Sequence, residues 1–595
     1  MKTIKYLSII PVGFVVILGI QACKKNFLDK PALGALSQSS VSNKTGVQGL
    51  LIGAYHSLLG EVNWGSAPSN WVFGSVAGGD SYKGSTPSDQ GDITPLEIWA
   101  YNANNPYLDQ KWNAIYHGVQ RANEVLRVMV NVTDLTDVEK KTIAGEAKFL
   151  RGYWHFEAKR IWNSVPYVDE TVTVTNGNLN APNADATGNY IDIWTKIEAD
   201  LQFAMDNLPE TQPQAGRANK WAAASYLAKA FLYEHKYPQA KALFDQITTS
   251  GKTAKGDKYD LVNYFSNFNA PQDNSAESIF AVQASVNEGS GTNGNYGDNL
   301  QFPNGSGPGG CCGFNNPSIS LANSYKTDPV TGLPLFSTYN TAGGDVSAPT
   351  GAYTGTLDPR IDFVMGRPGI PYMDWGLYPR DAWIREPATN GLFSPKKIVY
   401  AKAQVGSISS TETSFWGPTQ MSSINVNLMR YADVLLMAAE AEAEAGTLAK
   451  ALGYVNQVRS RAADPKGWVY KSGTYNASTA KYSDNATAAD NYKVSTYPVF
   501  TDKAFALQAI LFERKLELAM EGHRFFDLQR FDRGTGLMAT ELNAFAASEK
   551  SRPSPFSINN ATFTKGKNEF YPIPQNQIDL ENATGTIYLK QNPGY

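Results

Sequence analysis

A short segment of the chain combines aromatic rings with side-chain amides at close spacing. Within residues 96–104, Trp99 and Tyr101 stand beside Asn102 and Asn104. Aromatic rings stack on apolar C–H faces and amides bind hydroxyls, so this set suits a ligand with both features, such as a carbohydrate. The alternative is core packing, because Trp is mostly buried wherever it occurs. We expect Trp99 and Tyr101 to stack on ligand and the two asparagines to bind hydroxyls.

A second aromatic group, Trp375, Tyr378 and Trp383, occurs in a loop-rich part of the chain. The same chemistry makes these three residues further candidates for ligand contact, again with core packing as the alternative. The tryptophans that fall within predicted helices are assigned to packing instead: Trp112, Trp154, Trp162, Trp194 and Trp221.

Two adjacent cysteines, Cys311 and Cys312, stand between glycines in residues 309–314. Adjacent Cα atoms are about 3.8 Å apart across a trans peptide, which is shorter than disulfides prefer. Flanking glycines would relieve part of the resulting strain. The sequence leaves two possibilities open: a vicinal disulfide, whose ring would offer a rigid apolar platform to a sugar, or two unreacted thiols.

The chain lacks the usual motifs of catalysis and metal binding. Its five histidines do not have the spacing of zinc ligands, and there is no nucleophile elbow or phosphate-binding loop. Acidic residues are plentiful, but no pair has a spacing that singles it out for glycoside hydrolysis. We therefore expect a binding protein, not an enzyme, without cofactor or metal.

Composition narrows the class of protein further. The 595 residues are 42% hydrophobic, 12% aromatic and only 18% charged, which excludes global disorder. The net charge of −3 provides no basic field for nucleic acid, so no nucleic-acid partner is expected. Three cysteines in such a long chain exclude a disulfide scaffold.

The first residues have the features of an export signal. Lys2 and Lys5 precede an apolar run over residues 6–20, and Cys23 directly follows the small residue Ala22. This pattern predicts a bacterial lipoprotein signal peptide over 1–22, lipidation of Cys23 and a tether over 23–35. An uncleaved membrane anchor and an ordinary secretory signal are the alternatives. The remainder, 36–595, is expected to form a single domain.

Helical spacing of apolar residues dominates from about 111 to 244. It predicts helices over 109–130, 191–208, 218–235 and 238–247, and one that begins after a capping box at Thr136 and Glu139. Residues 227–244 match the offsets of a tetratricopeptide repeat and residues 438–455 match them less fully, with generic helix-pair packing as the alternative. Residues 249–423 and 60–105 are loop-rich. The predicted fold is mainly α, with tetratricopeptide-like helix pairs as scaffold and long loop-rich insertions.

Several blocks of the sequence, in this order, resemble those of the SusD/RagB family of outer-membrane nutrient-binding lipoproteins. They are residues 26–31, 144–153, 165–167, 428–441, 455–461, 513–530, 571–574 and 591–595. The resemblance implies a scaffold of four repeat-type helix pairs, glycan binding without catalysis, and a cell-surface position on the outer membrane. It also implies a TonB-dependent outer-membrane transporter of the SusC-like kind as partner. Asp80 and Tyr82 lie in a loop, residues 78–83, similar to one that family members place beside their ligand.

The resulting functional hypothesis is a lipoprotein that captures an oligosaccharide or polysaccharide and delivers it to the transporter. The alternatives are a helical scaffold or lid that binds no ligand, and capture of peptide in place of glycan. Charged residues on the apolar C-terminal helices are expected to pair with one another across helix interfaces. They are Arg430, Asp433, Glu440, Arg459, Arg461, Glu513, Arg514, Glu521, Arg524, Asp527 and Arg530.

Overall fold

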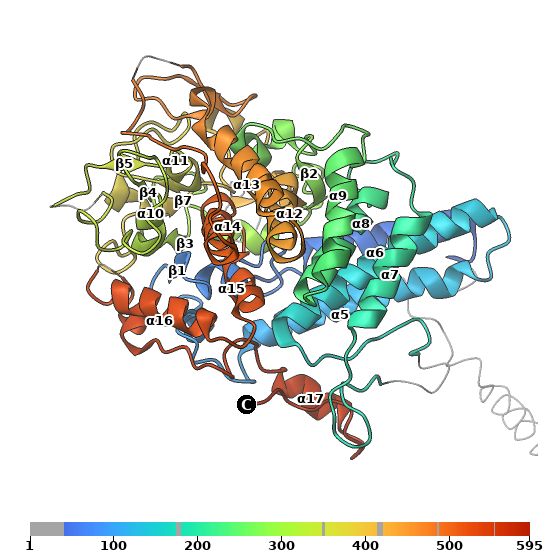
Figure 1. Ribbon diagram of the computed structural model, residues 1–595. Coiled ribbons are helices and arrows are strands. Elements are labelled where there is room, and N and C mark those ends of the chain that lie inside the picture. Colours follow the sequence, from blue (N-terminus) through green and yellow to red (C-terminus); the bar gives the residue numbers. More distant parts are fainter. Residues whose placement is uncertain (1–40, 174–179, 348–350, 413–419, 485–486, 553) are drawn as a thin grey trace, which may run out of the picture.

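The computed structural model describes residues 41–173, 180–347, 351–412, 420–484, 487–552 and 554–595, so Cys23 and the predicted signal and tether lie outside the described residues. Helices dominate the fold (Figure 1). They are α3 (Lys44–His56), α4 (Thr94–Glu97), α5 (Pro106–Met129), α6 (Asp137–Trp162), α7 (Trp194–Asn207), α8 (Lys220–Tyr233), α9 (Tyr237–Ser250), α10 (Ile319–Ser324), α11 (Ile361–Val364), α12 (Tyr431–Ala445), α13 (Leu448–Ala463), α14 (Lys503–Glu517), α15 (Arg524–Asp532), α16 (Leu537–Glu549) and α17 (Gln575–Glu581).

The scaffold is a row of antiparallel helix pairs. Each of α5 to α9 packs against the next, and α9 then contacts α12, which packs on α13 (Figure 1). The helices before and after the loop-rich insertion therefore form one continuous array, which confirms the predicted mainly α architecture. The predicted capping box is also present: Thr136 accepts from the backbone N–H of Glu139, and Glu139 accepts from that of Thr136.

Close approach of α5 and α6 depends on a glycine. A Cβ atom at Gly118 would lie 2.1 Å from Nε1 of Trp154, so any larger residue would force the helices apart. Trp154 is buried, as are Trp112, Trp162 and Trp221, and Trp112 contacts Trp162 edge-on with ring centroids 5.0 Å apart. Helix packing accordingly explains these four tryptophans, as the sequence predicts.

The insertion builds a second apolar core from loops, short helices and short strands. The strands of the described residues, of which only β2 to β7 lie in the insertion, are β1 (Ser81–Gly84), β2 (Ser278–Val282), β3 (Phe314–Pro317), β4 (Lys326–Thr327), β5 (Thr356–Leu357), β6 (Met365–Gly366), β7 (Ser394–Pro395), β8 (Val426–Arg430), β9 (Tyr475–Asn476) and β10 (Lys481–Tyr482). They pair antiparallel in twos: β1 with β3, β2 with β8, β4 with β5, β6 with β7 and β9 with β10. The β1–β3 pair, in which Tyr82 lies opposite Asn316, brings the first loop-rich stretch against the insertion.

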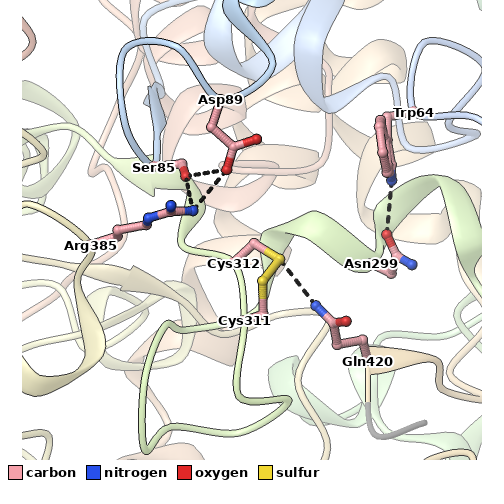
Figure 2. Close-up of a disulfide and its surroundings, with 8 residues drawn as sticks. All are labelled: Trp64, Ser85, Asp89, Asn299, Cys311, Cys312, Arg385 and Gln420. Carbon is pink, nitrogen blue, oxygen red and sulfur yellow. Dashed lines mark hydrogen bonds and ion pairs between the residues drawn. A yellow bond between two sulfur atoms is a disulfide. The ribbon is translucent and has the colours of Figure 1, made fainter. Parts of the chain in front are cut away.

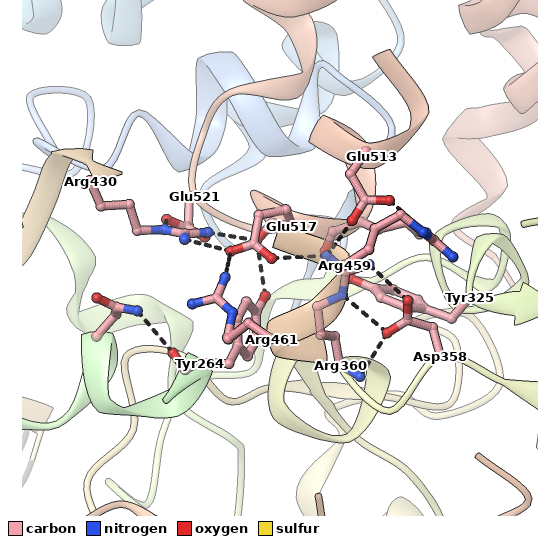
Figure 3. Close-up of polar contacts among 12 residues, drawn as sticks. Tyr264, Tyr325, Asp358, Arg360, Arg430, Arg459, Arg461, Glu513, Glu517 and Glu521 are labelled. Atoms are coloured by element: carbon pink, nitrogen blue, oxygen red, sulfur yellow. Dashed lines mark hydrogen bonds and ion pairs between the residues drawn. The ribbon is translucent and has the colours of Figure 1, made fainter. Parts of the chain in front are cut away.

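A network of buried charges joins the helical array to the insertion (Figure 3). Arg430 is 1% exposed and forms ion pairs with Glu277, Glu517 and Glu521, at 2.5–2.8 Å. Glu517 also pairs with Arg360 at 2.9 Å and with Arg461. Burial alone would raise the pKa of Glu517, but the three arginines hold it well below the ordinary value.

The other predicted charges behave in the same way. Ion pairs connect Arg459 with Glu513, Arg514 with Asp433 and Asp527, Arg524 with Glu541, and Arg530 with Glu440. The prediction that these charges pair structurally is therefore confirmed.

Candidate functional site

The predicted stacking platform lies in the core. Trp99 is 3% exposed, and its Nε1 donates to the carbonyl oxygen of Ala77 at 2.9 Å. Tyr101 is 4% exposed, and its hydroxyl donates to the carbonyl oxygen of Asn568 at 2.8 Å. Neither ring presents a face to a ligand, so the structure does not support the expectation that they stack on one. The packing alternative describes both residues.

The asparagines that follow these rings are exposed. Oδ1 of Asn102 accepts a hydrogen bond from the backbone N–H of Asn104 at 2.9 Å, which shapes the turn before α5. Asn105 then caps α5 by accepting from the backbone N–H of Tyr107. The two amides thus stand at the surface, and their contact with ligand stays a prediction.

Asp80 and Tyr82 are also core residues, contrary to expectation. Asp80 is 1% exposed and accepts from the backbone N–H of Met520 at 3.2 Å, and burial raises its pKa to about 6. The hydroxyl of Tyr82 donates to Glu549 and accepts from the backbone N–H of Ile319. Burial raises the pKa of Tyr82 well above its ordinary value. Both side chains bind loop 78–83 to the body of the protein.

The third predicted group belongs largely to the second core. Tyr378 and Trp383 are buried with ring centroids 5.6 Å apart, which again does not support ligand contact. Trp383 supports the loop before Cys311, because a Cβ atom at Gly307 would lie 3.0 Å from its ring. Trp375 is half-buried and donates from Nε1 to the carbonyl oxygen of Tyr400 at 3.0 Å. Its contact with ligand stays a prediction.

Cys311 and Cys312 form a disulfide, and polar and aromatic side chains from four loop segments gather around it (Figure 2). We call this group the disulfide site; its members are Trp64, Ser85, Asp89, Asn299, Cys311, Cys312, Arg385 and Gln420. Cys312 is buried in the main core, whereas Cys311 is only partly buried. Gln420 is itself buried and donates from Nε2 to Sγ of Cys312 at 3.2 Å.

Trp64 supplies an aromatic ring on one side of the disulfide site. The ring is half-buried, and its Nε1 donates to Oδ1 of buried Asn299 at 2.9 Å. Nδ2 of Asn299 lies 3.8 Å from Sδ of Met421, the residue next to Gln420. A continuous series of contacts therefore connects the ring of Trp64 with the sulfur of Cys312.

Arg385 and Asp89 form an exposed ion pair on the other side, at 2.8 Å between Nη1 and Oδ2. Their side chains are 40% and 31% exposed, respectively. Buried Ser85 connects them, because its Oγ donates to Asp89 at 2.8 Å and accepts from Arg385 at 3.0 Å. The backbone N–H of Ser85 donates to the carbonyl oxygen of Gly313 at 2.7 Å, which fixes this pair beside the disulfide.

Lys83 holds the loop that carries Asp89. Its ammonium group donates to the carbonyl oxygens of Thr86 and Asp89, both at 2.8 Å, and burial lowers its pKa. A cavity of about 450 Å³ adjoins this loop, and Lys83, Ser85 and Glu386 are among its lining residues. Its volume is within the range of about 300–1,000 Å³ that is typical of small-molecule sites.

The disulfide site thus has two layers. Trp64, Asp89, Arg385 and Cys311 are partly exposed, and each is bonded to a buried side chain. Such support fixes side chains before a ligand arrives and lowers the entropic cost of binding. One cation and one anion lie together at the surface, which suits a neutral ligand rich in hydroxyls.

Sequence reasoning missed most of these residues. The 60–105 and 249–423 stretches are correctly identified as loop-rich, and the disulfide site joins exactly those regions only through tertiary contacts. Trp64 lies in the first stretch, but nothing in its spacing connects it with Asn299, more than two hundred residues away. The adjacent cysteines Cys311 and Cys312, between glycines, are the local signal that marks the site.

Within the part of the chain that the structure describes, no three or more His, Cys, Asp or Glu side chains are grouped to hold a metal ion. In those same residues, no helix has both the length and the apolar character needed to cross a membrane.

Comparison with protein families identifies the chain. The family described as "SusD family" matches residues 276–595, more than half of the sequence. The chain belongs to the SusD family. A second description, "Starch-binding associating with outer membrane", matches residues 27–232. The sequence-based assignment to the SusD/RagB family is confirmed.

Individual relatives agree with this assignment. SusD-like protein P2 of Formosa agariphila is 23% identical over 98% of both chains. A SusD superfamily protein of Bacteroides vulgatus is similar in structure, with a TM-score of 0.65 and 19% identity over 93% of this chain and 99% of that one. Surface glycan-binding protein A of Bacteroides thetaiotaomicron, in complex with laminarihexaose, gives a TM-score of 0.56 and 17% identity over 92% and 99%. The chain therefore has the SusD-like fold over more than nine-tenths of its length.

Proposed function

We propose that this SusD family protein binds a glycan at the disulfide site. The observation that carries the proposal is the two-layered arrangement there, in which Trp64, Arg385 and Asp89 are each partly exposed and hydrogen-bonded to a buried side chain. The ring of Trp64 would stack on the C–H face of one sugar unit. Arg385 and Asp89, a donor and an acceptor side by side, would bind neighbouring hydroxyls.

Capture without catalysis is the proposed activity. Asp89 is engaged in the ion pair with Arg385, which suits its carboxylate to accept hydrogen bonds from hydroxyls. The complex of the similar surface glycan-binding protein with laminarihexaose supports a glycan as ligand class.

The proposed place of action is the outer surface of the outer membrane. Lipidation at Cys23 would anchor the protein there, and a SusC-like TonB-dependent transporter would receive the captured glycan. The family description that links starch binding with the outer membrane supports this location.

Affinity electrophoresis tests the binding step. Wild-type protein, W64A and W468A are run through native gels that contain laminarin, starch or no polysaccharide. Trp468 is the matched control, because it is also half-buried and donates from Nε1 to a carbonyl oxygen, that of Ala462. We expect wild-type protein and W468A to be retarded by at least one polysaccharide and W64A to migrate freely. Equal retardation of wild type and W64A would show that the glycan binds at another part of the protein.

Fractionation and co-purification test the location and the partner. Wild-type protein should remain in the outer-membrane fraction and co-purify with a transporter-sized protein after detergent extraction, whereas C23S should be released into the aqueous phase. Retention of C23S in the membrane would contradict anchoring through Cys23. Purification without a transporter-sized partner would contradict the proposed delivery of glycan to a transporter.

A helical scaffold or lid that binds no ligand is the second candidate. The burial of Trp99 and Tyr101 favours it, because an open cleft that exposed these rings would have favoured capture. The same experiments separate the two candidates: a scaffold co-purifies with the transporter but is retarded by no polysaccharide. Retardation by a peptide in place of a glycan would identify the peptide-capturing alternative.

A further inference from the structure

The Cys311–Cys312 bond has no evident role in stabilising the fold. Disulfides stabilise proteins mainly by closing a loop of chain and so restricting the unfolded state. Here the two cysteines are adjacent in sequence, so the bond closes no loop between distant segments. The segment that follows the cysteines is already held by two backbone hydrogen bonds, from Gly313 to Phe302 at 2.9 Å and from Ser85 to Gly313 at 2.7 Å.

One half of the ring that the disulfide closes is buried, and the other half is partly exposed. Cys312 packs in the core and receives the hydrogen bond from Gln420, whereas Cys311 is only partly buried. Gly309 contributes to the fit, since its φ is +77° and a Cβ atom there would lie 2.8 Å from the ring of Phe302. The chain therefore brings a rigid, apolar group of sulfur and methylene atoms to the surface.

The surroundings of this ring are those of a ligand contact. Arg385 and Asp89 stand beside it, and a Cβ atom at Gly313 would lie 3.4 Å from Cβ of Arg385. Trp64 stands on the opposite side, connected through Asn299 (Figure 2). An apolar surface between an aromatic ring and an ion pair matches the alternating C–H faces and hydroxyls of consecutive sugar units.

We propose that the Cys311–Cys312 disulfide ring is itself a glycan-binding platform, on which one sugar unit of the ligand lays its C–H face. This inference rests on the proposed function, and it adds a contact that no aromatic residue provides. Reduction would convert the ring into two thiols that rotate independently, so the platform exists only in the oxidised protein.

The first test measures affinity with and without the ring. C311A/C312A removes both sulfurs, and wild-type protein treated with dithiothreitol loses the bond while the reagent is oxidised to its cyclic disulfide. Binding is measured by the retardation in gels containing laminarin or starch and by calorimetry with laminarihexaose. We expect affinity about tenfold weaker in both cases, since the loss of one well-packed apolar contact of roughly 50 Å² corresponds to that factor.

The second test uses unaltered wild-type protein, so it does not depend on how the variant folds. The rate at which dithiothreitol reduces the disulfide is followed by thiol alkylation and mass measurement, with and without saturating glycan. We expect reduction to slow about tenfold when the glycan is present at about ten times its Kd, because the bound sugar covers the sulfur of Cys311. W64A, which binds glycan poorly, should show no such protection and serves as the control.

The outcomes separate this inference from the function on which it rests. Wild-type protein that binds none of the three glycan probes overturns the proposed glycan binding and the platform with it. Wild-type protein that binds a probe, together with unchanged affinity of C311A/C312A or an unchanged reduction rate, overturns the platform alone.

Discussion

Two arginine–carboxylate groups in this protein use the same chemistry for opposite purposes. Arg430 is 1% exposed and faces three glutamates, so its donors are directed at protein acceptors (Figure 3). Arg385 has a side chain that is 40% exposed and forms one ion pair, with Asp89 (Figure 2). The first group connects the helical array to the insertion, whereas the second presents a donor and an acceptor to solvent.

Burial and the number of partners account for the difference. Taking a charge out of water costs several kcal/mol, so a buried arginine is stable only when several acceptors surround it. An exposed pair keeps most of its hydration and contributes about 0–1 kcal/mol to stability. A site that must exchange water for sugar hydroxyls therefore requires the second arrangement. Substitutions in the buried region and in the exposed pair test this distinction.

The largest effect is expected from the centre of the buried network. E517Q removes the charge that Arg360, Arg430 and Arg461 share, and leaves them with excess buried positive charge. Breaking a buried pair of this kind costs about 3–5 kcal/mol. We expect a decrease of that size in the free energy of unfolding, measured by urea denaturation.

The matched control is D89N, which neutralises the carboxylate of the exposed pair. It should change the free energy of unfolding by less than about 1 kcal/mol. Similar losses of stability in E517Q and D89N would mean that the two groups do not differ in the way their burial implies.

The buried charge network could largely be predicted from the sequence, whereas the disulfide site could not. Arg459, Arg461 and Glu513 occur on helices rich in apolar residues, and helical periodicity places such charges at interfaces. Arg430 instead ends β8 and Glu521 follows α14, so their pairing depends on tertiary contacts. The capping box at Thr136 and the helix pairs follow from equally local patterns. Ring type and spacing do not reveal the burial of Trp99: its indole packs on Phe563, from the other end of the chain, and presents no face to a ligand. The disulfide site depends on contacts between segments 60–89, 299–313, 385 and 420, and no local pattern encodes them.

Asp80 is an exception within the buried region, since the described residues offer it no ion pair. Oδ2 accepts from Met520, but Oδ1 has no hydrogen-bond partner among them. Burial raises the pKa of Asp80 to about 6, against an ordinary value of 3.8, although Arg524, Lys515 and Lys397 oppose the shift. The carboxyl group of Asp80 therefore binds its proton more tightly in the folded protein than in the unfolded chain.

Asp80 therefore makes the free energy of unfolding fall as the pH rises. Below about pH 4, Asp80 is protonated in both the folded and the unfolded state, so its titration costs the folded state no stability. As the pH rises from about 4 to about 6, Asp80 ionises first in the unfolded chain, and the free energy of unfolding falls. D80N mimics the protonated form at every pH. We expect it to be as stable as wild type near pH 3.5 and about 3 kcal/mol more stable above pH 7, measured by urea denaturation across this range. A constant difference at all pH values would show that Asp80 does not titrate on unfolding.

The smallest effect on stability, and a clear effect on binding, is expected at Arg385. R385A removes the exposed partner of Asp89 and should lower the free energy of unfolding by at most about 1 kcal/mol, an effect that 1 M salt should remove. The affinity for whichever of laminarin and starch retards wild type should fall about tenfold or more, because a charge-assisted hydrogen bond to a hydroxyl is worth about 1.5–3 kcal/mol. The affinity of R385K should lie between those of wild type and R385A. An ammonium group keeps the charge but lacks the planar set of donors that a guanidinium offers to adjacent hydroxyls. A loss of stability near 3 kcal/mol in R385A, with unchanged affinity, would instead assign Arg385 to the structural class of Arg430 and leave Trp64 and the disulfide as the binding surface.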